Sequence, residues 1–174
     1  MTRLRAALTA LALTATVLLG GCAQTADTTA VVNGVVIRES AVDDMAQELV
    51  SSGAVGAYAA ARSSAASKLI AGEVARQVAR QNSITLTQPD ISSLSASNPT
   101  YAMFLTTPLG EQFATDYTDA VQVSSASTDW QQQFVALPVQ LNPRYGSWPA
   151  FVADLASATA AAPPTGSMSV VSGS

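Results

Sequence analysis

A hairpin signal near the start of the chain constrains the fold more than any other stretch. Two β-branched runs, Val31-Val32 and Val35-Val36-Ile37, flank Asn33-Gly34. A two-residue turn of type I′ needs positive φ at both central positions, and Asn-Gly adopts that conformation most readily. The sequence therefore predicts two antiparallel strands joined by a tight turn.

A helix is expected to begin at Ser40, directly after the second strand. Ser40 and Asp43 have the spacing of a capping box, in which two side chains bond the first free N–H groups of a helix. Val42, Met45 and Leu49 then recur at helical spacing, which predicts one buried stripe.

Further helices follow from composition and from cap signals. An alanine-rich helix is predicted from about Ala57 to Gln81. Gly72 inside it costs about 1 kcal/mol relative to alanine, which indicates that another helix comes close there. Thr87 and Thr107 each precede a proline, and this order predicts two more helix starts.

The C-terminal part of the chain contains one strand signal and a tail. Val139-Gln140-Leu141 alternates like a half-buried strand. Residues 156–174 are mainly Ala, Ser, Thr, Pro and Gly without periodicity, so we expect them to be disordered. The folded domain is accordingly expected over residues 30–155.

Residues 1–21 have the layout of an export signal, with a cationic head and an uncharged core. Leu19-Gly20-Gly21-Cys22 resembles the lipobox of bacterial lipoproteins, in which a diacylglyceryl group is attached to the cysteine and a peptidase cuts before it. A transmembrane anchor is the alternative, but the uncharged run Ala6–Leu19 is only 14 residues long, and a spanning helix needs about 20 apolar residues. We therefore expect lipidation at Cys22, a tether over residues 22–29, and a location on the extracytoplasmic face of the cell membrane.

Charge and composition exclude several partner classes. Removal of residues 1–21 takes away Arg3 and Arg5, so the net charge changes from −4 to −6 over 153 residues. An acidic surface repels nucleic-acid phosphate and anionic lipid headgroups, so no nucleic acid is expected as a partner. The single cysteine would carry lipid, which leaves no disulfide. Because much of the hydrophobic content is alanine, a mainly helical domain of modest stability is expected.

The side chains that usually carry catalysis are missing. The chain contains no histidine, so neither the common nucleophile–base pairs nor the common zinc ligand sets can be assembled. Two pairs of carboxylates, Asp116 with Asp119 and Asp44 with Glu48, lie one helical turn apart. A general acid needs a raised pKa in an apolar site, whereas both pairs are expected on solvated helix faces. No catalytic residue, metal or cofactor is therefore expected.

The order of these elements resembles a known family. Val32–Ile37 followed by an acidic helix is similar to the opening of the SurA-like N-terminal domain, which begins secreted foldases of the SurA and PrsA type. A long helix ending in Ala79–Asn82, the extended link Ile84–Thr87 and a helix start at Pro89-Asp90 follow in a similar order. The ending Leu141–Trp148 is similar to that of SurA-like lipoproteins from high-GC Gram-positive bacteria.

The resemblance implies both a fold and a function. In that family the N-terminal strands and a C-terminal strand form a small antiparallel sheet that closes a helical lobe, with Val139–Leu141 as the third strand here. The foldases also insert a parvulin prolyl isomerase domain, of on the order of a hundred residues, whose active site contains histidines. This chain has neither the room nor the histidines, so isomerase activity is not expected. The resemblance implies a non-catalytic, chaperone-like core that binds unfolded segments of exported proteins. An accessory lipoprotein that docks one folded envelope partner is the alternative.

The segment from Asn142 to Trp148 allows two interpretations. Arg144, Tyr145 and Trp148 could form a rim that stacks on a bound peptide. Alternatively, Asn-Pro begins a turn, Gly146 takes positive φ, and the two aromatic side chains cover the edge of the sheet. The structural interpretation is favoured because aromatic side chains are more often used in cores.

Overall fold

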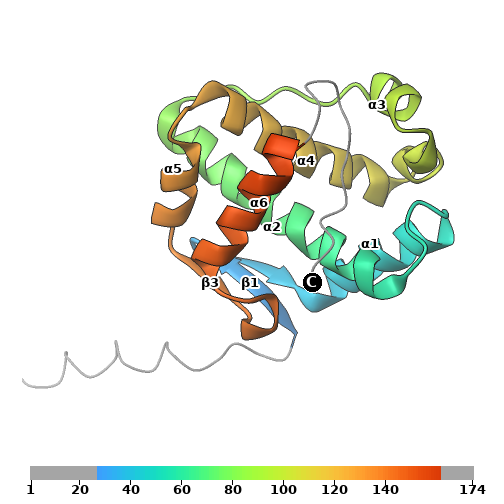
Figure 1. Ribbon diagram of the computed structural model, residues 1–174, viewed down its shortest axis with the longest axis horizontal. Coiled ribbons are helices and arrows are strands. Elements are labelled where there is room, and N and C mark those ends of the chain that lie inside the picture. The colour runs from blue at the N-terminus through green and yellow to red at the C-terminus, as the bar shows by residue number, and fades with distance from the viewer. Residues whose placement is uncertain (1–26, 162–174) are drawn as a thin grey trace, which may run out of the picture.

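The computed structural model describes residues 27–161. Helices α2 and α4 cross at the centre, α1 packs along α2, and a small sheet lies at one end of the helical lobe (Figure 1). The elements are β1 (Thr28–Val32), β2 (Val35–Arg38), α1 (Glu39–Ser51), α2 (Tyr58–Asn82), α3 (Ile91–Ser97), the 3₁₀ turns η1 (Pro99–Tyr101) and η2 (Phe104–Thr106), α4 (Pro108–Ala126), α5 (Trp130–Ala136), β3 (Val139–Leu141), η3 (Pro143–Tyr145) and α6 (Trp148–Ala161). The predicted fold class, mainly α with a small antiparallel sheet, is confirmed.

The sheet has the order β2-β1-β3, and both pairings are antiparallel. Asn33 and Gly34 have φ of 46° and 88°, the positive values that a type I′ turn needs. The predicted hairpin is therefore confirmed. The third strand is confirmed as well, and it brings the two ends of the domain together.

Helix α1 begins one residue earlier than expected. Arg38 precedes it, and no side-chain cap bond forms there among the described residues. The predicted capping box is wrong, because Asp43 binds Arg62 instead, at 2.7 Å between Oδ1 and Nε. The predicted stripe of Val42, Met45 and Leu49 is fully buried.

Helix α2 matches its predicted range closely, and Gly72 has the expected role. A Cβ atom at Gly72 would lie 2.7 Å from the Cα atom of Asp116 on α4. Only a residue without a side chain allows this approach. The glycine therefore allows α2 and α4 to come into close contact here.

The two predicted threonine caps have different outcomes. Thr107 does cap α4, because its Oγ1 accepts a hydrogen bond of 3.1 Å from Gly110 N–H. Thr87 does not cap a helix, since α3 begins at Ile91 with Asp90 as its cap. The Thr87 side chain instead donates to Gln122 on α4.

The prediction that disorder begins at residue 156 is wrong. Helix α6 runs from Trp148 to Ala161, so residues 156–161 are helical. Alanine has the highest helix propensity, and buried Val152 and Leu155 attach this helix to the core. The predicted signal, Cys22 and the tail after residue 161 lie outside the described residues.

Candidate functional site

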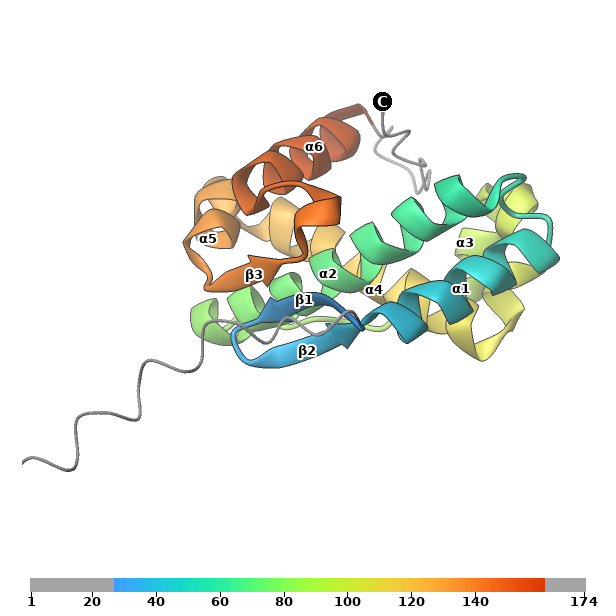
Figure 2. The same cartoon turned by 90° about the horizontal axis from the view of Figure 1, so that it is seen from below.

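Strand β2 forms an open edge of the sheet. It packs against β1 and the start of α1, and no strand within residues 27–161 pairs with its other side (Figure 2). Val35 and Val36 are 43% and 49% exposed. An edge strand presents unpaired backbone groups that can bind another extended chain.

The register shows which backbone groups are open. Thr29 and Asn33 bond toward β3, through Asn142 N–H to the Thr29 carbonyl and Asn33 N–H to the Pro138 carbonyl. Successive residues of a strand bond in opposite directions, so Val32 bonds toward Val35 in β2. The next residue of β2, Val36, therefore directs its N–H and C=O away from β1.

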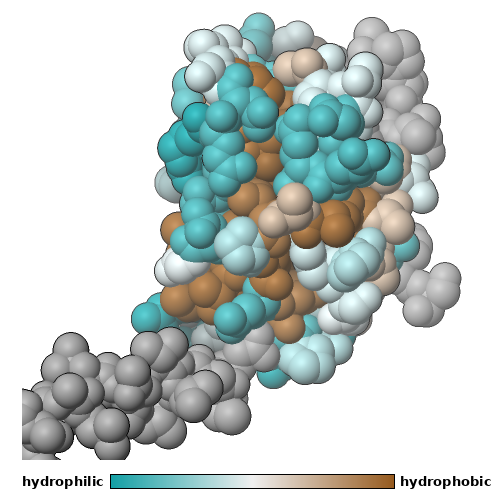
Figure 3. All heavy atoms as spheres, turned by 90° about the vertical axis from the view of Figure 1, so that its left-hand side faces the viewer, coloured by the Kyte–Doolittle hydropathy of each residue, from teal (hydrophilic) through white to brown (hydrophobic). Residues whose placement is uncertain are grey.

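Apolar side chains are also exposed on α5, beyond the turn of the hairpin. The hairpin turn touches the end of α5 through the 2.9 Å bond between Asn33 and Pro138. Figure 3 shows the side of the molecule on which α5 lies, where hydrophobic residues form a band between hydrophilic ones. Large apolar side chains of the hairpin, α5 and β3 that stay at least partly exposed include Val35, Val36, Trp130, Val135 and Val139. We call these five residues, with the edge of β2, the edge surface.

Trp148 lies in the core rather than on the sheet edge. It is 8% exposed, and its Nε1 donates a 3.1 Å hydrogen bond to the carbonyl of Phe134. Its ring stacks on Phe151, with 5.4 Å between centroids. Trp148 therefore attaches α6 to the end of α5, which agrees with the expectation that it packs over the hairpin or the helix ends, although it does not cover the edge of the sheet.

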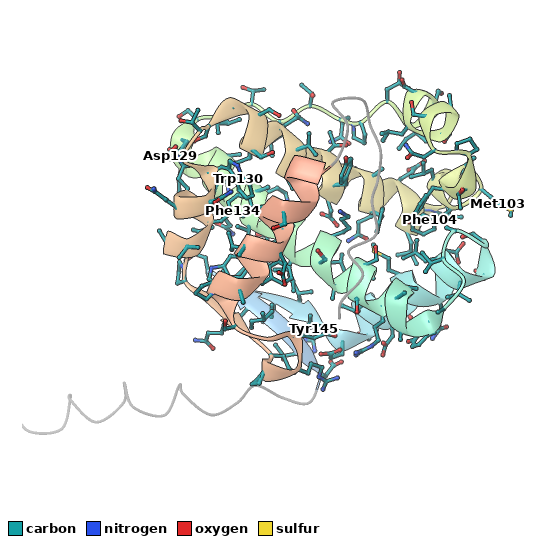
Figure 4. The ribbon with its side chains drawn as sticks, viewed as in Figure 1. Met103, Phe104, Asp129, Trp130, Phe134 and Tyr145 are labelled. Carbon is teal, nitrogen blue, oxygen red and sulfur yellow. The ribbon has the colours of Figure 1, made fainter. Side chains whose placement is uncertain are left out.

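Tyr145 (Figure 4) and Arg144 lie at a polar corner where side chains of η3, α1 and α2 meet near the start of β1. The Tyr145 hydroxyl donates to Glu39 Oε2 at 2.9 Å, and Arg144 Nη1 lies 3.6 Å from the same oxygen. Arg62 also binds this carboxylate and lies over the Tyr145 ring, 5.8 Å from its centroid. Burial, and then the bond to Glu39, raise the pKa of Tyr145 to about 12.

Glu39 is the centre of this polar corner, although the sequence did not single it out. The residue is 6% exposed, and its Oε1 atom has no hydrogen-bond partner among the described residues. Arg62 bridges it to Asp43, and the bond from Arg62 lowers the pKa of Asp43. Nearby, Asn142 Nδ2 donates to the carbonyl of Thr28 at 2.9 Å. The segment from Asn142 to Tyr145 thus joins the start of β1 to the start of α1.

The predicted solvent exposure of Asp116 and Asp119 is wrong. They are 1% and 4% exposed at the crossing of α2 and α4. Arg76 Nη1 lies 2.6 Å from Asp116 Oδ1 and 3.1 Å from Asp119 Oδ2. Burial raises the pKa of Asp116 to about 6, although Arg76 opposes the shift. The other carboxylate pair lies on the surface of the protein, as predicted, because Asp44 is exposed and Glu48 is partly exposed.

Lys68 is a second buried ionisable group that sequence reasoning missed. The chain's single lysine is 6% exposed on α2. Its Nζ lies 4.8 Å from the centroid of the Tyr117 ring, a cation–π contact. Burial lowers the pKa of Lys68 to about 8. Nothing in the spacing of α2 distinguished this lysine from a solvent-exposed one.

Within residues 27–161, no group of three or more His, Cys, Asp or Glu side chains is arranged to hold a metal ion. The helices of the same part of the chain include none with the length and apolar character needed to cross a membrane. No family model, curated protein or solved structure matches the chain.

Proposed function

We propose that the protein is a lipoprotein on the extracytoplasmic face of the cell membrane, anchored by diacylglyceryl on Cys22. Its core would act as a non-catalytic, chaperone-like module that binds unfolded segments of exported proteins. The observation that carries this proposal is the open edge at Val36, where an N–H, a C=O and an exposed apolar side chain coincide.

Such an edge binds extended chains by β-augmentation. A segment aligned with β2 would exchange two backbone hydrogen bonds with Val36, and these bonds do not depend on the segment's sequence. Each net hydrogen bond contributes only about 0.5–1.5 kcal/mol. Weak and sequence-tolerant binding suits a chaperone, which must release many different clients.

The neighbouring apolar residues add a preference for unfolded clients. Val35 and Val135 are both 43% exposed, and they would contact apolar side chains that a folded client buries. β2 itself has only four residues and leads directly into α1 at Glu39. A short edge limits self-association, which favours reversible capture over aggregation.

The predicted anchor places this surface near the membrane. Six residues, Cys22 to Asp27, separate the lipid from β1. At about 3.3–3.6 Å per residue they span at most roughly 20 Å. The sheet would therefore lie close to the bilayer, where exported chains emerge. The resemblance to the SurA-like N-terminal domain supports the same function, and the absence of histidine from the sequence argues against a parvulin-type activity.

The test is suppression of aggregation by the full-length lipoprotein in detergent micelles. A denatured client is diluted into buffer with and without a modest molar excess of the protein, and light scattering is followed. Val36→Pro removes the outward N–H without removing a bond to β1, and Val36→Thr keeps both the backbone and the β-branched shape. We expect the wild type and Val36→Thr to suppress scattering and Val36→Pro to lose most of the effect.

The proposal is wrong if the wild type neither lowers scattering nor retains unfolded client on a column. Crosslinking in membranes from a photoreactive residue at position 36 separates the alternative function. A spread of exported clients supports the chaperone, whereas one stoichiometric product indicates an accessory lipoprotein with a single folded partner.

A further inference from the structure

The crossing of α2 and α4 encloses a carboxyl group that is only half satisfied. Asp116 Oδ1 accepts a 2.6 Å hydrogen bond from Arg76, whereas the buried Oδ2 atom has no partner among residues 27–161. The backbone of Gly72 lies directly against Asp116. Since the residue is 1% exposed, its carboxyl group is shielded from bulk solvent.

One arginine serves several acids at this crossing. Arg76 of α2 binds Glu73 on its own helix and both Asp116 and Asp119 on α4. Glu73 has a second cation in Arg80, at 3.5 Å. A single, partly exposed guanidinium is therefore shared by three carboxylates.

The other elements that pack on α4 contribute no further charge to Asp116. Helix α5 (Trp130–Ala136) and the turn η2 (Phe104–Thr106) contain no ionisable side chains. On α1, Glu39 and Asp43 are bound to Arg62. Lys68 of α2 lies over Tyr117. Asp116 thus faces only Arg76, Asp119 and Glu73.

We propose that the contact between Gly72 and Asp116 is a pH-sensitive joint, in which charge on Asp116 loosens the packing of α4 against α2 and protonation tightens it. A charged carboxylate at this position has one oxygen without a donor in a site of low dielectric. Protonation removes the charge that is costly to bury and lowers the competition with Asp119 and Glu73 for Arg76.

The direction of the effect follows from the raised pKa. Burial raises the pKa of Asp116 from 3.8 to about 6, so the folded protein binds this proton more tightly than the unfolded chain does. The contribution of Asp116 to the free energy of unfolding is highest below about pH 4, falls as the pH rises through 6, and is constant above that. Between pH 5 and pH 7.5 this linkage corresponds to about a tenfold change in the opening equilibrium.

Few other side chains titrate between pH 5 and pH 7.5, and the lowered pKa of Lys68, about 8, lies above this range. Histidine is the side chain that ordinarily titrates between pH 5 and 8, and the sequence contains none. Burial also raises the pKa of Asp119, with Arg76 again opposing the shift. Asp116 is therefore the first place to look for a change in this range.

The experiment is amide hydrogen exchange on the full-length protein in detergent micelles at pH 5 and pH 7.5, corrected for the intrinsic exchange rates. For the wild type we expect protection of α2 and α4 amides around Gly72 and Asp116 to fall about tenfold at the higher pH. Asp116→Asn keeps the shape without the titration, so its protection should be the same at both values. Asp44→Asn, which changes an exposed carboxylate of α1, should behave like the wild type.

A second measurement does not depend on any variant. The carboxyl carbon of Asp116, followed by NMR in the wild type, should titrate with a midpoint near 6. A midpoint at or below 4 overturns the proposal. The proposal also fails if Asp116→Asn folds and retains the pH dependence of the wild type.

Discussion

The hydroxyl of Tyr145 donates a 2.9 Å hydrogen bond to the buried carboxylate of Glu39, although the two residues lie 106 positions apart. This bond joins the segment after β3 to the start of α1. Tyr145→Phe removes only the hydroxyl. Hydrogen bonds to charged groups contribute about 1.5–3 kcal/mol, so we expect the free energy of unfolding to fall by that amount in urea titrations.

Tyr58→Phe is the matched control for this measurement. The hydroxyl of Tyr58 also donates a hydrogen bond to a carboxylate, that of Asp43, but this bond lies on the exposed surface. We expect a change of no more than about 0.5 kcal/mol for Tyr58→Phe. Equal losses in the two variants would contradict a special role for the bond between Tyr145 and Glu39.

Trp148 tests whether the C-terminal segment is structural or binds a ligand. The side chain is buried against Phe134 and Phe151, so Trp148→Ala should cost about 3–5 kcal/mol. Domains of this size have only about 5–15 kcal/mol of stability. We therefore expect a much lower Tm or failure to fold. Met103→Ala, at a 65% exposed side chain, should leave the Tm nearly unchanged. If Trp148→Ala shifts the Tm by only one or two degrees, the structural interpretation is wrong.

Lys68 is expected to destabilise the fold at neutral pH. Its pKa is lowered to about 8, which means that the folded state holds this proton less tightly than the unfolded chain does. The free energy of unfolding should therefore rise as the pH increases from about 8 toward 10. Lys68→Met keeps the length of the side chain without the charge and should stabilise the protein by about 1–3 kcal/mol at pH 7.

The gain from Lys68→Met should shrink at pH 9.5, where the wild-type amine is mostly neutral in the folded state. Arg80→Met removes an exposed cation from the same helix and should show no such pH dependence. Urea titrations at the two pH values measure both effects. A gain for Lys68→Met that is the same at pH 7 and pH 9.5 would exclude desolvation of the amine as the cause.

The predicted anchor is tested through Cys22. Growth with a clickable fatty acid should label the wild type and leave Cys22→Ala unlabelled, as a precursor that retains Arg3 and Arg5. Gel mobility and mass spectrometry distinguish the two forms. A wild type without label, together with normal processing of Cys22→Ala, would contradict the lipobox interpretation.

The sequence correctly predicted turns and helix caps that depend only on neighbouring residues. Asn33-Gly34 requires a tight turn, and Thr107 before Pro108 caps α4 in the usual way. The burial of Asp116 was missed because charged side chains usually face solvent. Its spacing of seven residues from Leu109 and three from Phe113 in fact places it on the same side of the helix as these apolar residues. Because α4 lies at the centre of the lobe, α2 covers this side.

Other errors have a similar origin in tertiary contacts. Ser40 and Asp43 have the spacing of a cap, but Arg62, 19 positions after Asp43, binds that carboxylate instead. The polar corner around Glu39 combines residues from four separate elements, so no short motif could indicate it. The alanines after residue 155 suggested disorder because they lack periodicity, yet α6 continues through six of these residues.

The position of β3 in the sheet has a consequence for how the protein is made. Asn142 and Thr28, which share a hydrogen bond of 2.9 Å, are 114 residues apart. When the chain emerges N-terminus first during synthesis, β1 has β2 beside it almost immediately but waits for its other neighbour until nearly the whole domain has been made. Such long-range pairing slows folding. Throughout that interval the hairpin exposes two open edges instead of one, so a module proposed to capture unfolded chains is itself, while newly made, an unfolded chain that another copy could capture.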